Sequence, residues 1–466
     1  MLYEIYAQMK IVICGAGQVG TNIAKHLASE NNDVVMLDQS AERIQKISDT
    51  LDVQGITGLA AYPSALEAAG LREANMLIAV TYSDEVNMIA CQIAHSIFNV
   101  PTKIARVRNQ DYLLPTWGNL FSHEHIPIDV IISPEREIAR AIGRRLELPG
   151  TLEALTMANG KIKILGIRCN KTTPIIHTPL HHLTSMFAKL LIVIIGIIRD
   201  NKTVLPKIDE QLLPGDEVYF VCDSKQLSDV LASFGNKEPE PRNIIVAGGG
   251  NIGLTIAEEI DHKHSATSTK VIECNNYRAG YIAQSLKNAT VINGNVLDPE
   301  IMEEANISQG ETFVAVSNED EVNILSSVLA KRFGCKRTIS LTNSSTYTPL
   351  AAQIGIDTLV NPSAITVSRI LQHVRQGHIH QIYSIREDFG EVIEAEITET
   401  SILVGHSLKN NPLPSGITIS AIVRGEKVIL ATSDAIICSH DRVIAFTDYR
   451  AVKKIKKFFS VGHNFF

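Results

Sequence analysis

Two glycine-rich stretches carry the clearest chemical signal in the sequence. Gly15-x-Gly17-x-x-Gly20 follows a predicted strand, Lys10–Cys14, and precedes a predicted helix. Glycines at this spacing allow a tight turn and let N–H groups at the start of the helix approach a pyrophosphate. The alternative is a turn that serves only the packing of the helix on the strand. The same spacing recurs in the second half of the chain at Gly248, Gly250 and Gly253.

An acidic residue follows each glycine loop at the end of the next predicted strand. Asp38 comes 18 residues after Gly20, and Glu273 comes 20 residues after Gly253. A carboxylate at this distance is suited to accept hydrogen bonds from ribose hydroxyls and would repel a 2′-phosphate. The pattern therefore predicts binding of NAD rather than NADP, at two sites.

Paired carboxylates also recur, in "VTYSDEVN" and again 236 residues later in "VSNEDEVN". Asp84-Glu85 has the residue types for general acid–base work. However, the pair stands where a strand gives way to a helix, and there an aspartate at the N-cap accepts backbone N–H groups. We expect capping. Thr81 and its counterpart Ser317 stand at the strand ends, where ligands lie on such sheets.

Two arginines, Arg106 and Arg108, follow the next predicted strand of the first half. The second half has no arginine at the corresponding residues, Ser340 and Thr342. Arg106 could contact a phosphate, or it could belong to a solvated edge of the sheet, and the sequence leaves both readings open.

Signatures of a catalytic or metal centre are missing from the sequence. There is no HExxH, no P-loop lysine and no Ser/His/Asp order. The seven cysteines are scattered and form no CxxC pair, which favours a reducing cytosol and predicts no metal site. An NAD-dependent oxidoreductase with duplicated Rossmann domains stays as the alternative. Such an enzyme needs a substrate domain with a proton donor near the nicotinamide.

Bulk properties exclude two further classes. The chain has 466 residues and a net charge of −7, so we expect no nucleic-acid partner, because phosphate backbones require clustered positive charge. The longest apolar run, Leu190–Ile198, is far shorter than the roughly 20 residues that a membrane-spanning helix needs. We therefore expect no membrane span in this chain.

The whole chain is a tandem duplication of about 230 residues. In each copy, strands and helices alternate first, which predicts a parallel sheet with helices on both faces, and short strands follow. The predicted fold class is α/β, with two Rossmann-like doubly wound parallel-sheet domains, each followed by a small α+β domain. The expected boundaries are 9–142, 151–235, a linker at 236–242, 243–370 and 376–461.

With these motifs in hand, the sequence resembles the family of Trk potassium-uptake regulators, peripheral subunits built from two RCK (regulator of K⁺ conductance) units. In the first copy the resemblance rests on "GAGQVG", "AVTYSDEVNM" and "IDVIISPE". In the second copy it rests on "GGGNIG", "FVAVSNEDEVNI" and "SAIVRG". It covers the chain beyond its first eight residues. One departure is "LAAY" after Gly58, where a small polar run is usual in the family.

The resemblance implies a regulator without enzymatic activity that binds NAD(H), and in related proteins ATP or ADP, in its Rossmann clefts. It implies a potassium-translocating Trk membrane subunit as partner and a homo-oligomer, with four chains closing an eight-unit ring. The location implied is cytoplasmic, peripheral at the inner face of the cell membrane. The implied first site consists of Gly15, Ala16, Gly17, Gln18, Val19, Gly20, Asp38, Leu59, Thr81 and Arg106. The implied second site consists of Gly248, Gly249, Gly250, Asn251, Ile252, Glu273, Asn295 and Ser317.

Overall fold

The computed structural model of the chain describes residues 9–30, 32–180, 182, 192–200, 202–204, 206, 209–236, 241–263, 267–344, 347–351, 353–374, 379–386, 389–407, 413–414, 416–430, 434–448 and 451. Residues 237–240 of the expected linker lie outside this described part. The chain forms two compact units. One comprises the residues up to Glu137 together with Ser363–Arg375, and the other comprises Ile138–Pro362 and Gln376–Phe466.

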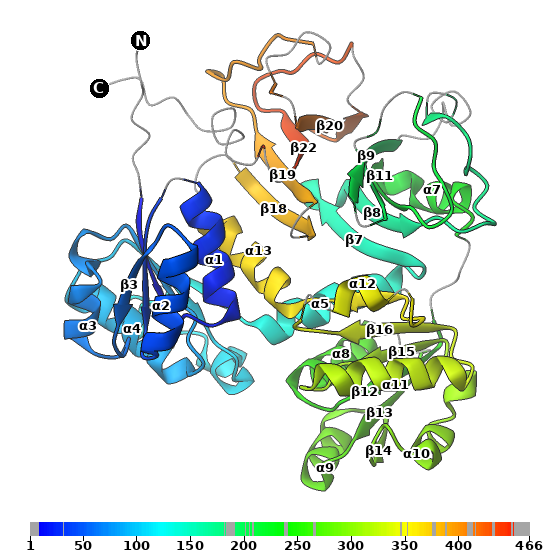
Figure 1. Ribbon diagram of the computed structural model, residues 1–466, viewed down its shortest axis with the longest axis horizontal. Coiled ribbons are helices and arrows are strands. Elements are labelled where there is room, and N and C mark those ends of the chain that lie inside the picture. Colours follow the sequence, from blue (N-terminus) through cyan, green and yellow to red (C-terminus); the bar gives the residue numbers. More distant parts are fainter. Residues whose placement is uncertain are drawn as a thin grey trace. The chain divides into compact units, whose positions relative to one another are not determined.

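The first unit is built on a six-stranded parallel sheet with the strand order β3-β2-β1-β4-β5-β6 (Figure 1). Its strands are β1 (Lys10–Cys14), β2 (Asp33–Asp38), β3 (Gln54–Thr57), β4 (Met76–Ala79), β5 (Thr102–Arg106) and β6 (Val130–Ile132). The helices between them are α1 (Gln18–Ser29), α2 (Ala41–Thr50), α3 (Pro63–Ala68) and α4 (Asp84–Ser96). This order places the topological switch point between β1 and β4, where ligands bind to doubly wound sheets.

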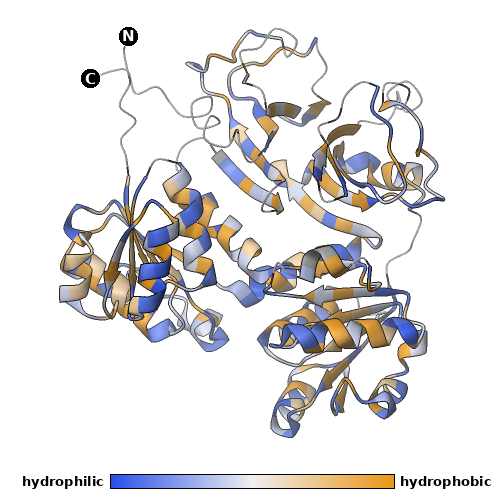
Figure 2. Ribbon diagram, in the orientation of Figure 1, coloured by the Kyte–Doolittle hydropathy of each residue, from blue (hydrophilic) through white to orange (hydrophobic). Residues whose placement is uncertain are grey.

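Both faces of this sheet are covered by helices. Side chains of β1 alternate between two buried clusters, Ile11 and Ile13 on one face and Val12 and Cys14 on the other. Helices α1 and α2 pack on the first face, and α3 and α4 pack on the second. Strands buried on both faces become nearly continuous apolar runs, and Figure 2 shows the strands of both parallel sheets largely in the hydrophobic colour.

A second parallel sheet repeats this order as β14-β13-β12-β15-β16-β17. Its strands are β12 (Asn243–Ala247), β13 (Ser268–Glu273), β14 (Thr290–Asn293), β15 (Thr312–Ala315), β16 (Arg337–Leu341) and β17 (Thr358–Val360). The helices of this domain are α8 (Asn251–Lys263), α9 (Asn276–Ser285), α10 (Pro299–Glu304), α11 (Asp320–Arg332) and α12 (Thr348–Ala351).

Two small domains in the second unit have antiparallel five-stranded sheets, ordered β10-β9-β11-β8-β7 and β18-β19-β22-β20-β21. The first contains β7 (Thr151–Met157), β8 (Ile162–Arg168), β9 (Ile192–Arg199), β10 (Lys202–Val204), β11 (Glu217–Asp223) and α7 (Leu227–Ser233). The second contains β18 (Ile379–Arg386), β19 (Gly390–Glu396), β20 (Ile417–Arg424), β21 (Lys427–Leu430) and β22 (Arg442–Asp448). They share one apolar core, in which the Tyr219 and Phe389 rings lie 5.0 Å apart.

The predicted fold class is confirmed, but the sequence did not predict an exchange of helices between the copies. Helix α13 (Pro362–Val374) belongs to the second copy, yet its apolar face, including Ile370 and Leu371, packs in the core of the first sheet. Helix α5 (Pro134–Glu147) belongs to the first copy, and its part from Ile138 onward lies in the second unit. There Leu146 and Ile256 of α8 line the same small pocket.

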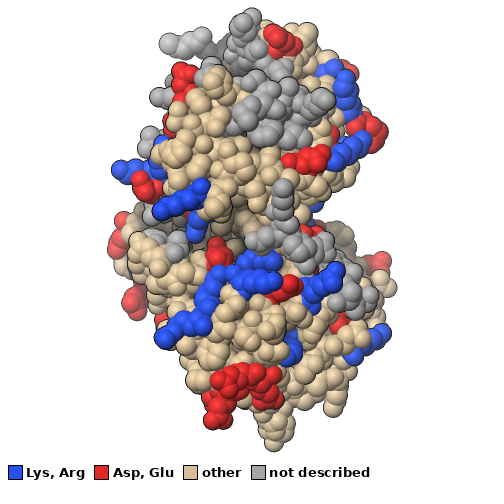
Figure 3. Space-filling model, turned by 90° about the vertical axis from the view of Figure 1, so that its right-hand side faces the viewer, with Lys and Arg blue, Asp and Glu red and all other residues tan. Residues whose placement is uncertain are grey.

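No helix within the described ranges is long and apolar enough to cross a membrane. On the face displayed in Figure 3, basic and acidic side chains are interspersed over the described surface.

Candidate functional site

The first glycine loop, between β1 and α1, uses its three glycines in different ways. Gly15 has a φ of +111°, and a Cβ on it would lie 2.9 Å from the main-chain oxygen of Val80. A Cβ on Gly20 would collide with the main-chain oxygen of Gly15. Both positions need glycine, one for the turn and one for close packing of the helix. Around Gly17, by contrast, a Cβ would meet no atom within 4 Å.

Packing therefore does not explain the middle glycine. Gly17 has φ −78° and ψ −176°, a conformation that any residue adopts, and it immediately precedes the first turn of α1. A side chain here would fill only the space in front of the helix N-terminus, where backbone N–H groups attract anions. The turn-only alternative accounts for Gly15 and Gly20 but leaves Gly17 without a reason.

The second glycine loop repeats this division of roles. Gly248 has a φ of +104°, and a Cβ on it would lie 2.8 Å from the Ser317 nitrogen. A Cβ on Gly253 would collide with the main-chain oxygen of Gly248, whereas a Cβ on Gly250 would meet nothing within 4 Å. Both copies thus keep an open approach to a helix N-terminus.

The two acidic residues lie directly against these loops. Asp38 accepts a hydrogen bond from the Ala16 N–H at 2.7 Å and another from the Ser40 N–H at 2.8 Å. Glu273 accepts from the Gly249 N–H at 2.7 Å and from the Asn275 N–H at 2.8 Å. A carboxylate has about four acceptor positions, so each of these groups can still accept hydroxyl hydrogens from a ribose.

Leu59 and Asn295 lie at the ends of the strands that pair with those carrying the acidic residues. They follow β3 and β14, and the residue before each is tied to the neighbouring strand. The Gly58 N–H donates to the main-chain oxygen of Asp38 at 2.9 Å, and the Gly294 N–H donates to that of Glu273 at 3.0 Å. The remaining predicted loop residues lie in the loops or the first turns of α1 and α8; they are Ala16, Gln18, Val19, Gly249, Asn251 and Ile252.

Thr81 and Ser317 lie at the expected strand ends, but their hydroxyls are already engaged. The Thr81 hydroxyl donates to the side-chain oxygen of Asn87 at 2.7 Å. The Ser317 hydroxyl donates to the main-chain oxygen of Glu319 at 3.2 Å. The side chains of both residues therefore serve the local turn.

The repeated "DEVN" also contains a residue whose role was not predicted from the sequence. Asn87 is fully buried; its side chain accepts from the Thr81 N–H at 2.8 Å and donates to the main-chain oxygen of Arg106 at 2.9 Å. Asn323 makes the same two links, from Ser317 to Leu341. The sequence does contain a signal for this role, because the asparagine recurs in both copies, six residues after Thr81 or Ser317.

The expectation that Asp84 caps its helix is wrong. The N-cap of α4 is Ser83, whose hydroxyl accepts from the Val86 N–H. Asp84 is buried in the first turn and accepts from the N–H groups of Arg108, at 2.9 Å, and Asn109, at 2.8 Å. Its carboxylate fixes the loop after β5, because that loop has backbone donors within reach and the helix end already has a cap.

Arg106 and Arg108 have different electrostatic surroundings. Arg108 donates from Nε to the buried carboxylate of Glu135 at 3.1 Å. The Nε of Arg106 is buried and has no hydrogen-bond partner among the described atoms. Burial lowers the pKa of Arg106, and the neighbouring charge of Arg108 lowers it further. The charges of Glu135 and Asp84 act in the opposite direction and raise this pKa. An anionic ligand at the end of β5 would give the Nε the partner that it lacks.

In both copies these groups gather at the carboxyl ends of the central strands, next to the switch point. The glycine loop offers N–H groups, the acidic residue offers acceptors for a diol, and in the first copy Arg106 adds a cation. This combination suits a ribonucleotide with a phosphate or pyrophosphate. The second copy has the buried Leu341 in the place of Arg106, since Asn323 bonds to its main-chain oxygen as Asn87 does to that of Arg106.

Comparisons with known proteins agree with this division of the chain. The TrkA-N domain matches residues 11–134 and 244–362, and the TrkA-C domain matches residues 164–235 and 392–460. The chain is 44% identical to the Trk system potassium uptake protein TrkA of Azorhizobium caulinodans, over 98% of this chain and 100% of that protein. It is 39% identical to the protein of the same name from Halomonas elongata, with the same coverage.

Two solved structures support the fold. The GsuK RCK domain superposes with a TM-score of 0.60 and 17% identity, over 98% of this chain and 96% of that chain. The GsuK channel bound to NAD superposes with a TM-score of 0.60 and 16% identity, over 98% of this chain and 79% of that chain.

Proposed function

The chain belongs to the TrkA family of Trk system potassium uptake proteins, and on that premise we propose that it is a nucleotide-sensing regulatory subunit that gates a Trk-type potassium-translocating membrane protein. In this proposal it binds NAD(H) in the first cleft and a nucleotide such as ATP or ADP in the second. It acts from the cytoplasm, as a peripheral subunit at the inner face of the cell membrane.

The observation that carries the proposal is the open middle glycine of each loop beside an acidic residue. Gly17 and Gly250 are free of packing demands, and Asp38 and Glu273 keep acceptor positions. The buried Nε of Arg106, which has no hydrogen-bond partner among the described atoms, adds a reason for a ligand with a pyrophosphate in the first cleft. A neighbour of the same fold is described as bound to NAD, which supports the ligand class.

Calorimetric titration of NADH into the purified full-length protein tests the first site. We expect Asp38→Ala to weaken binding, because ribose hydroxyls lose their acceptor. Gly17→Val is the sharper variant, because valine suits the extended backbone at this position and would stand in the path of the ligand. Unchanged affinity in both variants, with unchanged unfolding midpoints, would remove the first-site assignment.

Gating requires that a nucleotide bind two conformations of the assembly with different affinity. In the proposed ring of four chains and eight units, small changes at each cleft would add around the ring and act on the membrane partner. The coupling must be reciprocal, so the partner must change nucleotide affinity. Co-purification with the Trk membrane subunit from solubilised membranes, with and without NADH and ATP, tests this. A chain that never co-purifies under any nucleotide would be a free-standing sensor.

The proposal assigns no catalysis to the chain. The recurrent carboxylate Asp84, the best candidate for acid–base work, is already bonded to the backbone of the loop after β5. We expect bound NADH to be retained with its absorbance at 340 nm unchanged. Steady consumption of NADH with a small substrate would instead identify an oxidoreductase.

A further inference from the structure

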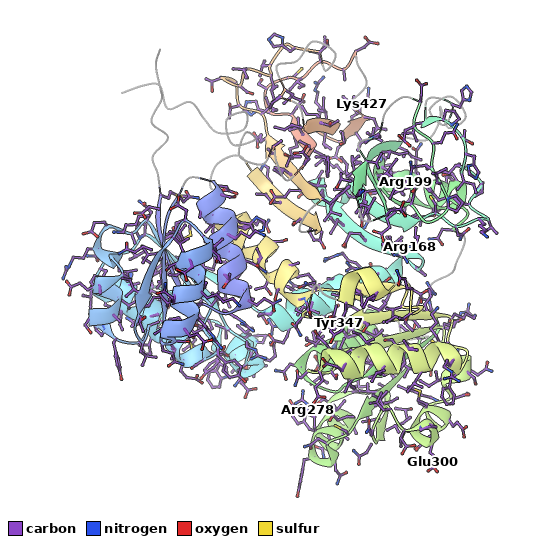
Figure 4. The ribbon with its side chains drawn as sticks, viewed as in Figure 1. Arg168, Arg199, Arg278, Glu300, Tyr347 and Lys427 are labelled. Carbon is purple, nitrogen blue, oxygen red and sulfur yellow. The ribbon has the colours of Figure 1, made fainter. Side chains whose placement is uncertain are left out.

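Arg278, the third residue of α9, turns back over the glycine loop of the second copy (labelled in Figure 4). Its Nε donates to the main-chain oxygen of Gly249 at 2.7 Å, and its Nη2 donates to the side-chain oxygen of Asn251 at 3.2 Å. Its guanidinium carbon lies 5.0 Å from the centre of the Tyr281 ring. The cation is therefore held beside the first residue of α8, between its contacts with Gly249 and Asn251, the two neighbours of Gly250.

All these partners of Arg278 are neutral: a carbonyl, an amide and an aromatic face. Within the described part of the chain Arg278 has no ion pair with a carboxylate, while Glu273 next to it uses its oxygens for the N–H groups of Gly249 and Asn275. A guanidinium carries five N–H donors, and two are used. The remaining donors and the full charge are available to an anion at the loop.

The first copy has an arginine at the same helix position, but that arginine does not contact the glycine loop. Arg43 is the third residue of α2 and is exposed. The first copy carries its cation on β5 instead, as Arg106, and the second copy has Leu341 there. The two clefts therefore bring their positive charge from opposite sides of the switch point.

This difference has a chemical meaning. A dinucleotide on such a sheet lies across the switch point, with one nucleotide on each side. Arg106 stands on the side of β4 and β5, where the distal nucleotide lies. Arg278 stands on the side of β13, where Glu273 can hold the first ribose. The second cleft thus concentrates its polar groups on a single nucleotide and its phosphates.

Resting on the proposed nucleotide binding, we infer that Arg278 is a phosphate-binding, specificity-determining residue, which makes the second cleft selective for a ribonucleoside di- or triphosphate over a dinucleotide. A terminal phosphate carries more charge than a pyrophosphate diester and leaves its oxygens free for the planar fork of the guanidinium. Glu273 supplies the ribose contact, and the loop N–H groups and the α8 N-terminus supply the rest.

The test uses the full-length protein with the first cleft closed by Gly17→Val, so that calorimetry reads only the second cleft. The probes are ADP, NAD and adenosine. We expect ADP to bind more tightly than NAD in this background. Adding Arg278→Ala should weaken ADP about tenfold to a hundredfold, the range of a lost charged hydrogen bond, and leave adenosine within about twofold. Arg278→Lys should recover only part of the affinity, since it restores charge without the fork.

Arg43→Ala is the matched control, being the same residue at the same helix position of the other copy, and should leave ADP binding unchanged. Gly250→Val should abolish ADP binding in the Gly17→Val background. If Gly250→Val abolishes binding but Arg278→Ala does not weaken it, or if NAD binds more tightly than ADP, the inference about Arg278 is wrong and nucleotide binding stands. If the Gly17→Val protein binds no probe, the second cleft is not a nucleotide site and both ideas fail for it.

Discussion

The side-chain amide of Asn87 donates a hydrogen bond to the main-chain oxygen of Arg106 at 2.9 Å, so helix α4 fixes the end of the strand that carries Arg106. The same asparagine accepts from both the N–H and the hydroxyl of Thr81. One buried side chain thus sets the spacing between two edges of the first cleft.

Removing this amide should cost both stability and binding. Asn87→Ala leaves the partly buried N–H of Thr81 and the partly buried carbonyl of Arg106 without this partner, which costs about 2 to 4 kcal/mol. We expect a lower unfolding midpoint in urea and weaker NADH binding by calorimetry. Asn323→Ala should lower stability in the same way without affecting the first cleft. An Asn87→Ala protein with wild-type stability would contradict the bridging role.

The three glycines of the first loop should respond differently to the same substitution. Gly15→Ala places a Cβ at a φ of +111° and against the Val80 oxygen, and should destabilise the fold by about 1 to 3 kcal/mol. Gly17→Ala meets no atom within 4 Å and should leave the unfolding midpoint unchanged while weakening NADH. Thermal unfolding and calorimetry on both variants measure this separation. Equal destabilisation by the two would show that Gly17 is also a packing glycine.

Alanine substitutions of Arg106 and Arg108 should have different effects on stability. Arg106→Ala removes a buried, unpaired donor, so the unfolding midpoint should stay the same or rise, while NADH affinity should fall about tenfold to a hundredfold. Arg108→Ala deprives the buried Glu135 carboxylate of its partner and should lower stability by about 1 to 3 kcal/mol. If Arg106→Ala lowered stability as much as Arg108→Ala, the Arg106 guanidinium would stabilise the fold and would not be kept for a ligand.

Cys274, the exposed cysteine beside Glu273, gives a pH-dependent probe of the second cleft. Partial burial raises the pKa of this thiol, and the Glu273 charge and hydrogen bond raise it further. The thiolate is the reactive form, so labelling with a disulfide reagent should be slow at neutral pH and accelerate as pH rises. Glu273→Gln should lower the pKa of the thiol and speed labelling at pH 8, measured in a Cys438→Ser background. An identical pH–rate profile would show that Glu273 does not control this thiol.

Much of the fold was readable because local patterns determine it. The strand–glycine–helix units at Gly15 and Gly248, the acidic residues that follow them and the doubled 230-residue plan all follow from periodicity and turn chemistry. The sheet on which α13 packs cannot be predicted in this way. The pattern of an amphipathic helix shows that one of its faces is buried, but it does not show which sheet that face covers. Arg43 and Arg278 make the same point for side chains: the same residue at the same helix position points to solvent in one copy and to the loop in the other.

The candidate site was predictable only in part. The recurrent "DEVN" drew attention to its carboxylates, but the structure shows that its asparagine is the buried bridge and its aspartate fixes a neighbouring loop. Burial decides which polar residue of a motif is structural, and burial comes from tertiary packing that a single sequence does not reveal.

The packing of α13 on the first sheet also means that the core of the first domain is completed late during synthesis of the chain. The sheet that starts at Lys10 has all its strands once β6 is made, yet Ile370 and Leu371 of its covering helix follow about 240 residues later. At roughly 5 to 20 residues per second, the part of this face that α13 covers, beside α1 and α2, stays exposed for on the order of 10 to 50 s. During that interval the exposed part can bind the α13 helix of another chain instead, which is the geometry of a domain swap.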